Sequence, residues 1–188
     1  MGLESKNNSV FDEIYDTYAG TVYKTAMKYS ENHHVAEEIV QDVFLKLLRH
    51  EKGVNKEAAG KWLTLTTKHM ALNYNRDHAR EYLVEDLLYD EEALDQEVEE
   101  SPENRLLTRI EHEEEARLLD DIFGALYREN PRWYEAVTIT YVLEKPQKEV
   151  AKEMGITLEV LHSTLYRAKR WIRRNYGDRY RHLDSIRK

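Results

Sequence analysis

The sequence contains no cysteine, so disulfide bridges and thiolate metal ligands are excluded. Proline and glycine are scarce as well, with 3 and 7 among 188 residues, whereas Leu, Glu, Lys, Arg and Ala are abundant. Few helix breakers among many helix formers indicate an all-α protein. No apolar run reaches about 18 residues and the first ten residues are polar, so we expect no membrane insertion and a cytoplasmic location.

Negative charge is concentrated in the middle of the chain. The formal net charge is −8, which is unusual for a protein that binds nucleic acid. Residues 81–115, however, hold 15 acidic and 2 basic residues, whereas residues 116–188 hold 10 acidic and 15 basic ones. Repulsion among like charges favours a solvated linker in the middle segment. The sequence therefore predicts two small helical domains joined by an acidic linker, with a basic C-terminal part suited to anionic partners.

The N-terminal half has the apolar spacing of three helices. The first covers residues 11–27, the second follows a cap at Asn32 with its apolar stripe over residues 36–48, and the third covers residues 58–80. Trp62 could stack on a single-stranded base, but its spacing with neighbouring apolar residues favours a place in the core.

Capping residues and prolines mark four helices in the C-terminal half. They predict helices over 102–128, 131–142, 147–154, and from a cap at Thr157 to about Gly177. The resulting division of the chain is a first domain at 9–80, a linker at 81–101, a second domain at 102–177 and a basic tail at 178–188.

The last two predicted helices have the pattern of a helix-turn-helix. Ala151 is small where the helices approach each other, Gly155 permits the tight turn, and Leu161 faces the angle between them. In such motifs the second helix enters the major groove. The side chains that we expect to face DNA are Thr157, Glu159, His162, Ser163, Tyr166, Arg167 and Arg170. A helical hairpin with a solvated basic tail is the alternative.

Three segments carry a family resemblance when they are taken in order. They are VAEEIVQDVFLKLL at 35–48, KWLTLTTKHMALNYNR at 61–76, and residues 147–174 with their STLYRAK stretch. The first resembles the helix of sigma factors that docks on the polymerase clamp, the second their promoter-melting and −10-reading helix, and the third their −35-reading motif. Together they resemble RNA polymerase sigma factors of the sigma-70 family, in the extracytoplasmic-function (ECF) group, which keeps only these two domains.

The resemblance implies a sigma region 2-like domain followed by a sigma region 4-like domain. The protein would be a promoter-specificity subunit that binds bacterial core RNA polymerase, recognises −35 and −10 elements and helps to open DNA, without cofactor or catalysis. Its partners would be core polymerase and promoter DNA, with an anti-sigma factor left open. The resemblance assigns polymerase contact to Glu38, Gln41 and Asp42. It assigns −10 contact to Lys61, Lys68, His69, Asn73, Tyr74, Arg76 and Arg80.

Two departures from the family pattern concern the DNA-reading helices. Asn73 stands where an acidic residue is common, and Glu159 stands where a small one is common. Glu159 could accept a hydrogen bond from a cytosine amino group or weaken contact with DNA.

Three other functions compete with the sigma-factor interpretation. Glu31 with His34, and Glu159 with His162, have the Glu-x-x-His spacing of di-iron bundles, but the inward stripes are apolar, so we predict no metal site and no enzyme. A stand-alone helix-turn-helix regulator would bind duplex DNA tightly without polymerase. A helical adaptor is the third alternative.

Overall fold

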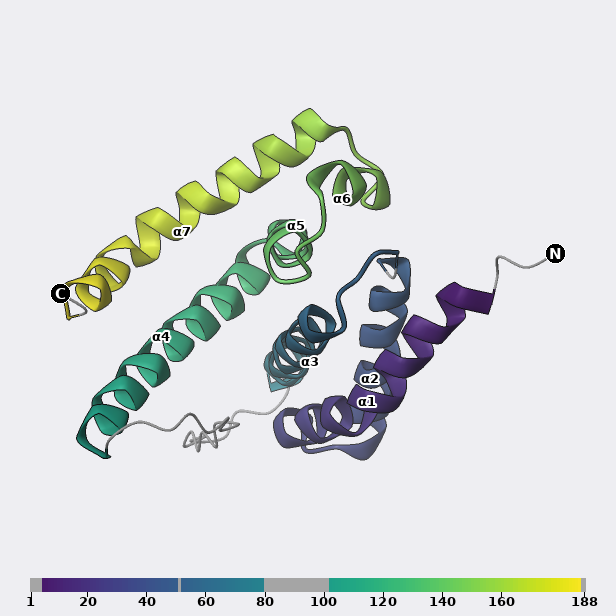
Figure 1. Ribbon diagram of the computed structural model, residues 1–188, viewed down its shortest axis with the longest axis horizontal. Helices are drawn as coiled ribbons and strands as arrows, with labels where there is room; N and C mark the ends of the chain where they lie inside the picture. Colours follow the sequence, from purple (N-terminus) through teal and green to yellow (C-terminus); the bar gives the residue numbers. More distant parts are fainter. Residues whose placement is uncertain (1–4, 51, 80–101, 187–188) are drawn as a thin grey trace.

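The computed structural model describes residues 5–50, 52–79 and 102–186, and within these ranges every regular element is a helix (Figure 1). The helices are α1 (Ser5–Ser30), α2 (His33–Arg49), α3 (Lys56–Ala79), α4 (Pro102–Glu129), α5 (Pro131–Tyr141), α6 (Gln147–Glu153) and α7 (Leu158–Ile186). The predicted all-α fold class is confirmed. None of the described helices is both long and apolar enough to cross a membrane.

The N-terminal half packs α1, α2 and α3 against one another. Asn32 caps α2 as predicted, since its side-chain oxygen accepts from the backbone N–H groups of His34 (3.0 Å) and Val35 (3.4 Å). Asn55 caps α3 in the same way. Trp62 is 3% exposed, which confirms its predicted place in the core.

The C-terminal half packs α4 along α7, with α5 and α6 beside them (Figure 1). The predicted helix starts are confirmed: Asn130 caps α5, Pro131 occupies its first turn, and the hydroxyl of Thr157 accepts from the N–H of Val160 at the start of α7. Ser101, the predicted cap of α4, and the linker at 81–101 lie outside the described residues.

The predicted end of the last helix near Gly177 was wrong, because α7 continues to Ile186. A glycine inside a helix costs about 1 kcal/mol relative to alanine. Contacts with α4 lie on both sides of Gly177: the Tyr176 hydroxyl donates to the Asp121 carbonyl oxygen (3.5 Å), and Arg179 pairs with the Asp121 carboxylate (2.9 Å). Tertiary packing therefore overrides the local stop signal.

The two halves are in contact through α3, which packs on α1 and α2 on one side and on α4 on the other (Figure 1). Buried apolar residues of both halves belong to one continuous cluster that runs from Ile14 to Ala168. The expectation from sequence was two small helical domains joined by an acidic linker, and no sequence signal indicated this contact. The predicted domain boundaries stay a prediction.

Candidate nucleic-acid interface

The turn between α6 and α7 has the hydrogen bonds of a Schellman C-cap. The N–H of Ile156 donates to the carbonyl of Ala151 (2.9 Å), and the N–H of Gly155 donates to that of Lys152 (3.2 Å). Gly155 has φ +65°, a left-handed conformation that costs glycine little. This geometry ends α6 sharply, and Thr157 then starts α7.

The angle between α6 and α7 is filled by apolar side chains. Val150 and Ala151 from α6, and Leu161 from α7, are buried, and Ile156 of the turn is half-buried. Leu165 and Ala168 continue the buried side of α7. The expected packing of a helix-turn-helix is present.

The opposite face of α7 is open to solvent. All seven side chains predicted to face DNA are exposed, namely Thr157, Glu159, His162, Ser163, Tyr166, Arg167 and Arg170. Tyr166 is 64% exposed, a large value for an aromatic side chain. Their contact with DNA stays a prediction, but they share one accessible surface.

Two predicted residues on this surface make contacts within α7. Arg167 donates from Nε to the Ser163 carbonyl (3.3 Å) and from Nη2 to the Ser163 hydroxyl (3.2 Å), which directs its guanidinium along the helix surface. Hydrogen bonds from the backbone at Glu159 and from the side chain of Thr157 lower the pKa of Glu159. Glu159 therefore stays ionised at the start of the helix, where the positive end of the helix dipole favours an anion.

Basic side chains extend the exposed face of α7 toward its C-terminus. The exposed members are Lys169, Arg170, Arg173, Arg174 and Arg179. Lys169 lies over the ring of Tyr141, 4.5 Å from its centroid, so α5 contributes an exposed aromatic beside the basic row. Exposed basic side chains of this kind are suited to contacts with the phosphates of a nucleic-acid backbone.

The residues predicted to meet the −10 strand differ in exposure along α3. Lys61 and Arg76 are exposed, and Arg76 pairs with Asp77 (3.2 Å) and donates to Asn73 (2.7 Å). Tyr74 is half-buried against the core. Arg80 lies outside the described residues.

Lys68 and His69, also predicted to meet the −10 strand, face the C-terminal half. The ammonium group of Lys68 lies 2.7 Å from the Asp120 carboxylate of α4, and the His69 ring, 2% exposed, lies 3.4 Å from the same carboxylate. His69 Nδ1 also lies 3.2 Å from the hydroxyl of Tyr134 on α5. Gly124 of α4 lies against the His69 ring, since a Cβ there would stand 3.4 Å from its Nε2. We name Lys68, His69, Asp120 and Tyr134 the Asp120 cluster.

Electrostatics stabilise the ionised forms in the Asp120 cluster. Burial on its own raises the pKa of Asp120, but contacts with His69 and Lys68 outweigh it, so the pKa lies below its usual range. For Lys68 the effect of burial has the opposite sign, because burial on its own lowers the pKa of an amine. The neighbouring Asp120 and Tyr29 outweigh that effect, so the pKa of Lys68 is raised. Burial also raises the pKa of Tyr134, which stays neutral. The pair between Lys68 and Asp120 is therefore charged at neutral pH.

An open groove of about 630 Å³ runs along the same boundary between α1, α3 and α4. Lys61 and Lys68 both line it, together with Asp120 from the C-terminal half. The groove thus brings the half-buried Lys68 and the exposed Lys61 together, with an acidic side chain from α4 beside them.

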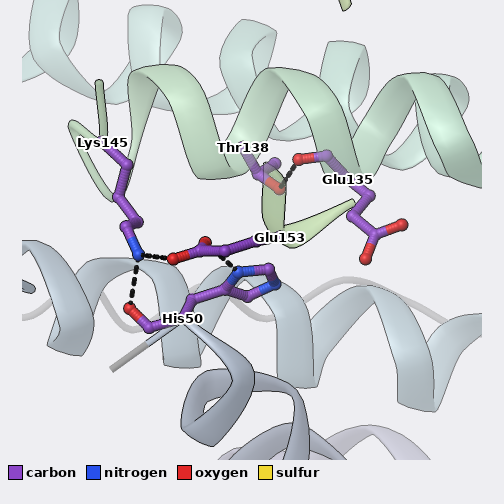
Figure 2. Close-up of polar contacts among 5 residues, drawn as sticks. All are labelled: His50, Glu135, Thr138, Lys145 and Glu153. Atoms are coloured by element: carbon purple, nitrogen blue, oxygen red, sulfur yellow. Dashed lines mark hydrogen bonds and ion pairs between the residues drawn. The ribbon is translucent and has the colours of Figure 1, made fainter. Parts of the chain in front are cut away.

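A second polar cluster joins the halves at the end of α2 (Figure 2). His50 Nδ1 lies 2.7 Å from a carboxylate oxygen of Glu153 on α6, and Lys145, from the loop before α6, pairs with the other oxygen. The Lys145 ammonium group also donates to the His50 carbonyl (2.9 Å). We name these three residues the Glu153 cluster.

Glu38, Gln41 and Asp42, predicted to contact polymerase, lie on the exposed face of α2. Leu48, predicted on the buried stripe of that helix, is 42% exposed, so this assignment was wrong. Leu45 is 55% exposed and falls on the same face as Asp42 by helical spacing. The outward face of α2 is therefore mixed acidic and apolar.

The residues with Glu-x-x-His spacing do not converge on an inward site. Glu31, His34, Glu159 and His162 are all exposed. Across 5–50, 52–79 and 102–186, no group of three or more His, Asp or Glu is placed to hold a metal ion.

Comparison with known proteins identifies the family. Residues 14–81 match Sigma-70 region 2. The chain is 26% identical over 166 residues to the ECF RNA polymerase sigma factor SigM of Bacillus subtilis. The aligned residues cover 88% of this chain and 94% of SigM. This chain belongs to the ECF group of the sigma-70 family. Sigma factors are transcription initiation factors and not enzymes.

Two further relatives of this sigma factor are longer. ECF RNA polymerase sigma factor BldN of Streptomyces coelicolor is 30% identical over 171 residues, covering 89% of this chain and 61% of BldN. ECF RNA polymerase sigma factor SigE of Mycolicibacterium smegmatis is 25% identical over 164 residues, covering 87% and 60%. The chain therefore spans about three fifths of these two proteins.

The polar groups that join the two halves of this sigma factor were missed from the sequence. Glu153 and Asp120 carry no local signal, because their partners are distant in the chain. Lys145 has a side chain only 1% exposed although it precedes a proline in a loop. Its burial depends on two partners that only the folded chain brings together.

Proposed function

We propose that this sigma factor is a promoter-specificity subunit that binds bacterial core RNA polymerase and acts with it in the cytoplasm. In this proposal α7 reads the −35 element, α3 and the groove beside it hold the −10 strand, and the protein helps to open the DNA. The observation that carries the proposal is the exposed face of α7. It presents seven predicted DNA-facing side chains in a chain that also matches Sigma-70 region 2.

The chemistry of α7 supports two kinds of contact with duplex DNA. Ser163, Tyr166 and Glu159 offer hydrogen-bonding groups that can discriminate base edges in the major groove. Arg167 and Arg170 supply charge for guanine edges or phosphates, and the basic row continues beyond them. The low pKa of Glu159 keeps an acceptor there, which favours a cytosine amino group over a phosphate.

The face of α2 is the proposed site for core polymerase. Glu38, Gln41 and Asp42 offer charge and hydrogen bonds, and Leu45 adds an apolar contact beside them. A mixed surface of this kind suits a protein interface with an apolar centre and a polar rim. An anti-sigma factor is a further proposed partner, for which the same outward surfaces are available.

The test is reconstitution with core RNA polymerase. The purified chain should co-elute with core enzyme in size-exclusion chromatography, and the complex should initiate transcription at discrete sites on genomic DNA from the source organism. Glu38→Lys combined with Asp42→Lys should abolish co-elution, whereas Glu37→Lys, an exposed change on the same helix, serves as the control. Failure of the unaltered chain to bind core enzyme would defeat the proposal. Tight duplex binding without polymerase would favour a stand-alone regulator instead.

A further inference from the structure

An exposed tyrosine outside the helix-turn-helix lies against a lysine of α7. Tyr141 is the last residue of α5, and it is 43% exposed. The ammonium group of Lys169 lies 4.5 Å from the centroid of the Tyr141 ring, which is within the range of a cation–π contact. This contact joins α5, which precedes the helix-turn-helix, to the basic side chains of α7.

The Tyr141 ring holds Lys169 without neutralising it. Among the side chains that the structure describes, no carboxylate pairs with the Lys169 ammonium group. Arg179, further along α7, differs in this respect because its guanidinium pairs with Asp121. An aromatic face attracts a cation through its quadrupole and carries no opposing net charge. The ammonium group of Lys169 therefore keeps its charge for an anion from outside the chain.

Lys169 lies on one flank of the exposed face of α7. It follows Tyr166 by three positions and precedes Arg173 by four, so these three exposed side chains form one row along the helix. By helical spacing, Arg167 and Arg170 lie closer to the middle of the exposed face. When a helix enters a major groove, the middle of its exposed face meets base edges and its flanks meet the two sugar-phosphate backbones. The position of Lys169 therefore suits a phosphate better than a base.

We propose that Lys169 contacts a backbone phosphate at the −35 element and that Tyr141 is a positioning residue for this contact. The inference rests on the proposed function for the role of α7. A free lysine side chain has many rotamers, and a partner that restricts them beforehand reduces the entropy lost when DNA binds. Tyr141 supplies that restriction from a helix outside the recognition motif.

A double-mutant cycle in the polymerase complex separates positioning from direct contact. Binding to a mapped promoter is measured at several salt concentrations for Tyr141→Leu, Lys169→Met and the combined variant. Lys169→Met should weaken binding and reduce, by about 1, the slope of the logarithm of the binding constant against the logarithm of the salt concentration. Tyr141→Leu should weaken binding about two- to fivefold, the scale of an exposed cation–π contact, and leave that slope unchanged. In the Lys169→Met background, Tyr141→Leu should have no further effect on binding.

Two controls make the result specific to this pair. Tyr141→Phe keeps the aromatic ring and should bind the promoter as tightly as the unaltered complex. Arg173→Met removes another exposed cation of the same row, and Tyr141→Leu should still weaken binding in that background. Thermal unfolding followed by circular dichroism establishes that each variant keeps its helices. The proposal would be overturned by an equal effect of Tyr141→Leu with and without the Lys169→Met change, or by equally weak binding of Tyr141→Phe and Tyr141→Leu.

Amine acetylation of the free chain, followed at Lys169 by mass spectrometry, tests the contact without DNA. Tyr141→Leu should raise the acetylation rate of Lys169 about two- to fivefold, and Tyr141→Phe should leave the rate unchanged. An unchanged rate in Tyr141→Leu would overturn the positioning role. Failure of the unaltered chain to bind core enzyme and promoter would defeat the proposed function and the phosphate contact with it, whereas promoter binding without the expected coupling would overturn only this inference.

Discussion

Replacement of Asp120 by asparagine tests whether the contact between α3 and α4 contributes to stability. Asp120 lies 2.7 Å from the Lys68 ammonium group, and the two side chains are 27% and 15% exposed. A hydrogen bond to a charged group contributes about 1.5–3 kcal/mol, so we expect Asp120→Asn to lower the free energy of unfolding by about 2 kcal/mol. For a chain of this size the loss corresponds to about 4–8 °C in Tm.

The pH dependence of this loss follows from the direction of the pKa shifts. The pKa of Asp120 lies below its ordinary value of 3.8 in the folded protein, so its contribution is fully present above that value and disappears as the pH falls through the folded pKa. The pKa of Lys68 is raised above 10.5, so its contribution persists below that value and disappears in stronger base. The difference in free energy of unfolding between the unaltered protein and Asp120→Asn should therefore be constant from about pH 5 to 9 and become smaller toward about pH 3.

Urea unfolding followed by circular dichroism measures these differences. Asp121→Asn is the control, since its pair with Arg179 is more than half exposed on both sides and contributes about 0.5 kcal/mol or less. Lys68→Met completes a double-mutant cycle, in which we expect a coupling of about 1–2 kcal/mol with Asp120→Asn. Equal losses of free energy of unfolding in Asp120→Asn and Asp121→Asn would refute the reasoning. A coupling free energy near zero between Lys68→Met and Asp120→Asn would refute it as well.

Two further predictions concern the helix-turn-helix. Arg167→Ala and Arg170→Ala should each weaken occupancy of the −35 element by the polymerase complex. Each loss of a phosphate contact should also reduce, by about 1, the slope of the logarithm of the binding constant against the logarithm of the salt concentration. Mobility-shift titration at several salt concentrations measures both effects, and unchanged occupancy in both variants would show that α7 does not face DNA. Leu161→Ala removes a fully buried side chain between α6 and α7 and should cost about 2–5 kcal/mol. Val160→Ala on the exposed side is its control, and a loss below about 1 kcal/mol in Leu161→Ala would contradict the packing described for the motif.

Local signals explain why so much of the fold was predictable. Asn32, Asn130 and Thr157 cap helices through bonds to their own neighbours, and Gly155 adopts the turn conformation that its sequence context predicts. The alternation of buried and exposed positions on α7 follows directly from helical spacing. These features depend on residues a few positions apart, so a single sequence is enough to find them.

Long-range contacts account for what was missed. The burial of His69 depends on Asp120, Gly124 and Tyr134, which lie 50 or more positions further along the chain. The extension of α7 past Gly177 depends on Asp121 of α4 in the same way. Neither set of partners is specified by spacing or propensity. The sequence therefore places the −10 candidates on a helix but does not show which side of α3 packs against α4.

Footprinting of the polymerase complex on a mapped promoter tests most directly whether the N-terminal and C-terminal halves of this chain bind separate promoter elements. Hydroxyl-radical cleavage shows the −35 contact, and permanganate oxidation of unpaired thymines shows opening at −10. We predict two protected segments and open thymines with the unaltered chain, with protection lost only at −35 in Arg167→Ala. A single continuous footprint that both Arg167→Ala and Lys61→Ala weaken throughout, or no footprint that depends on this protein, would contradict the account.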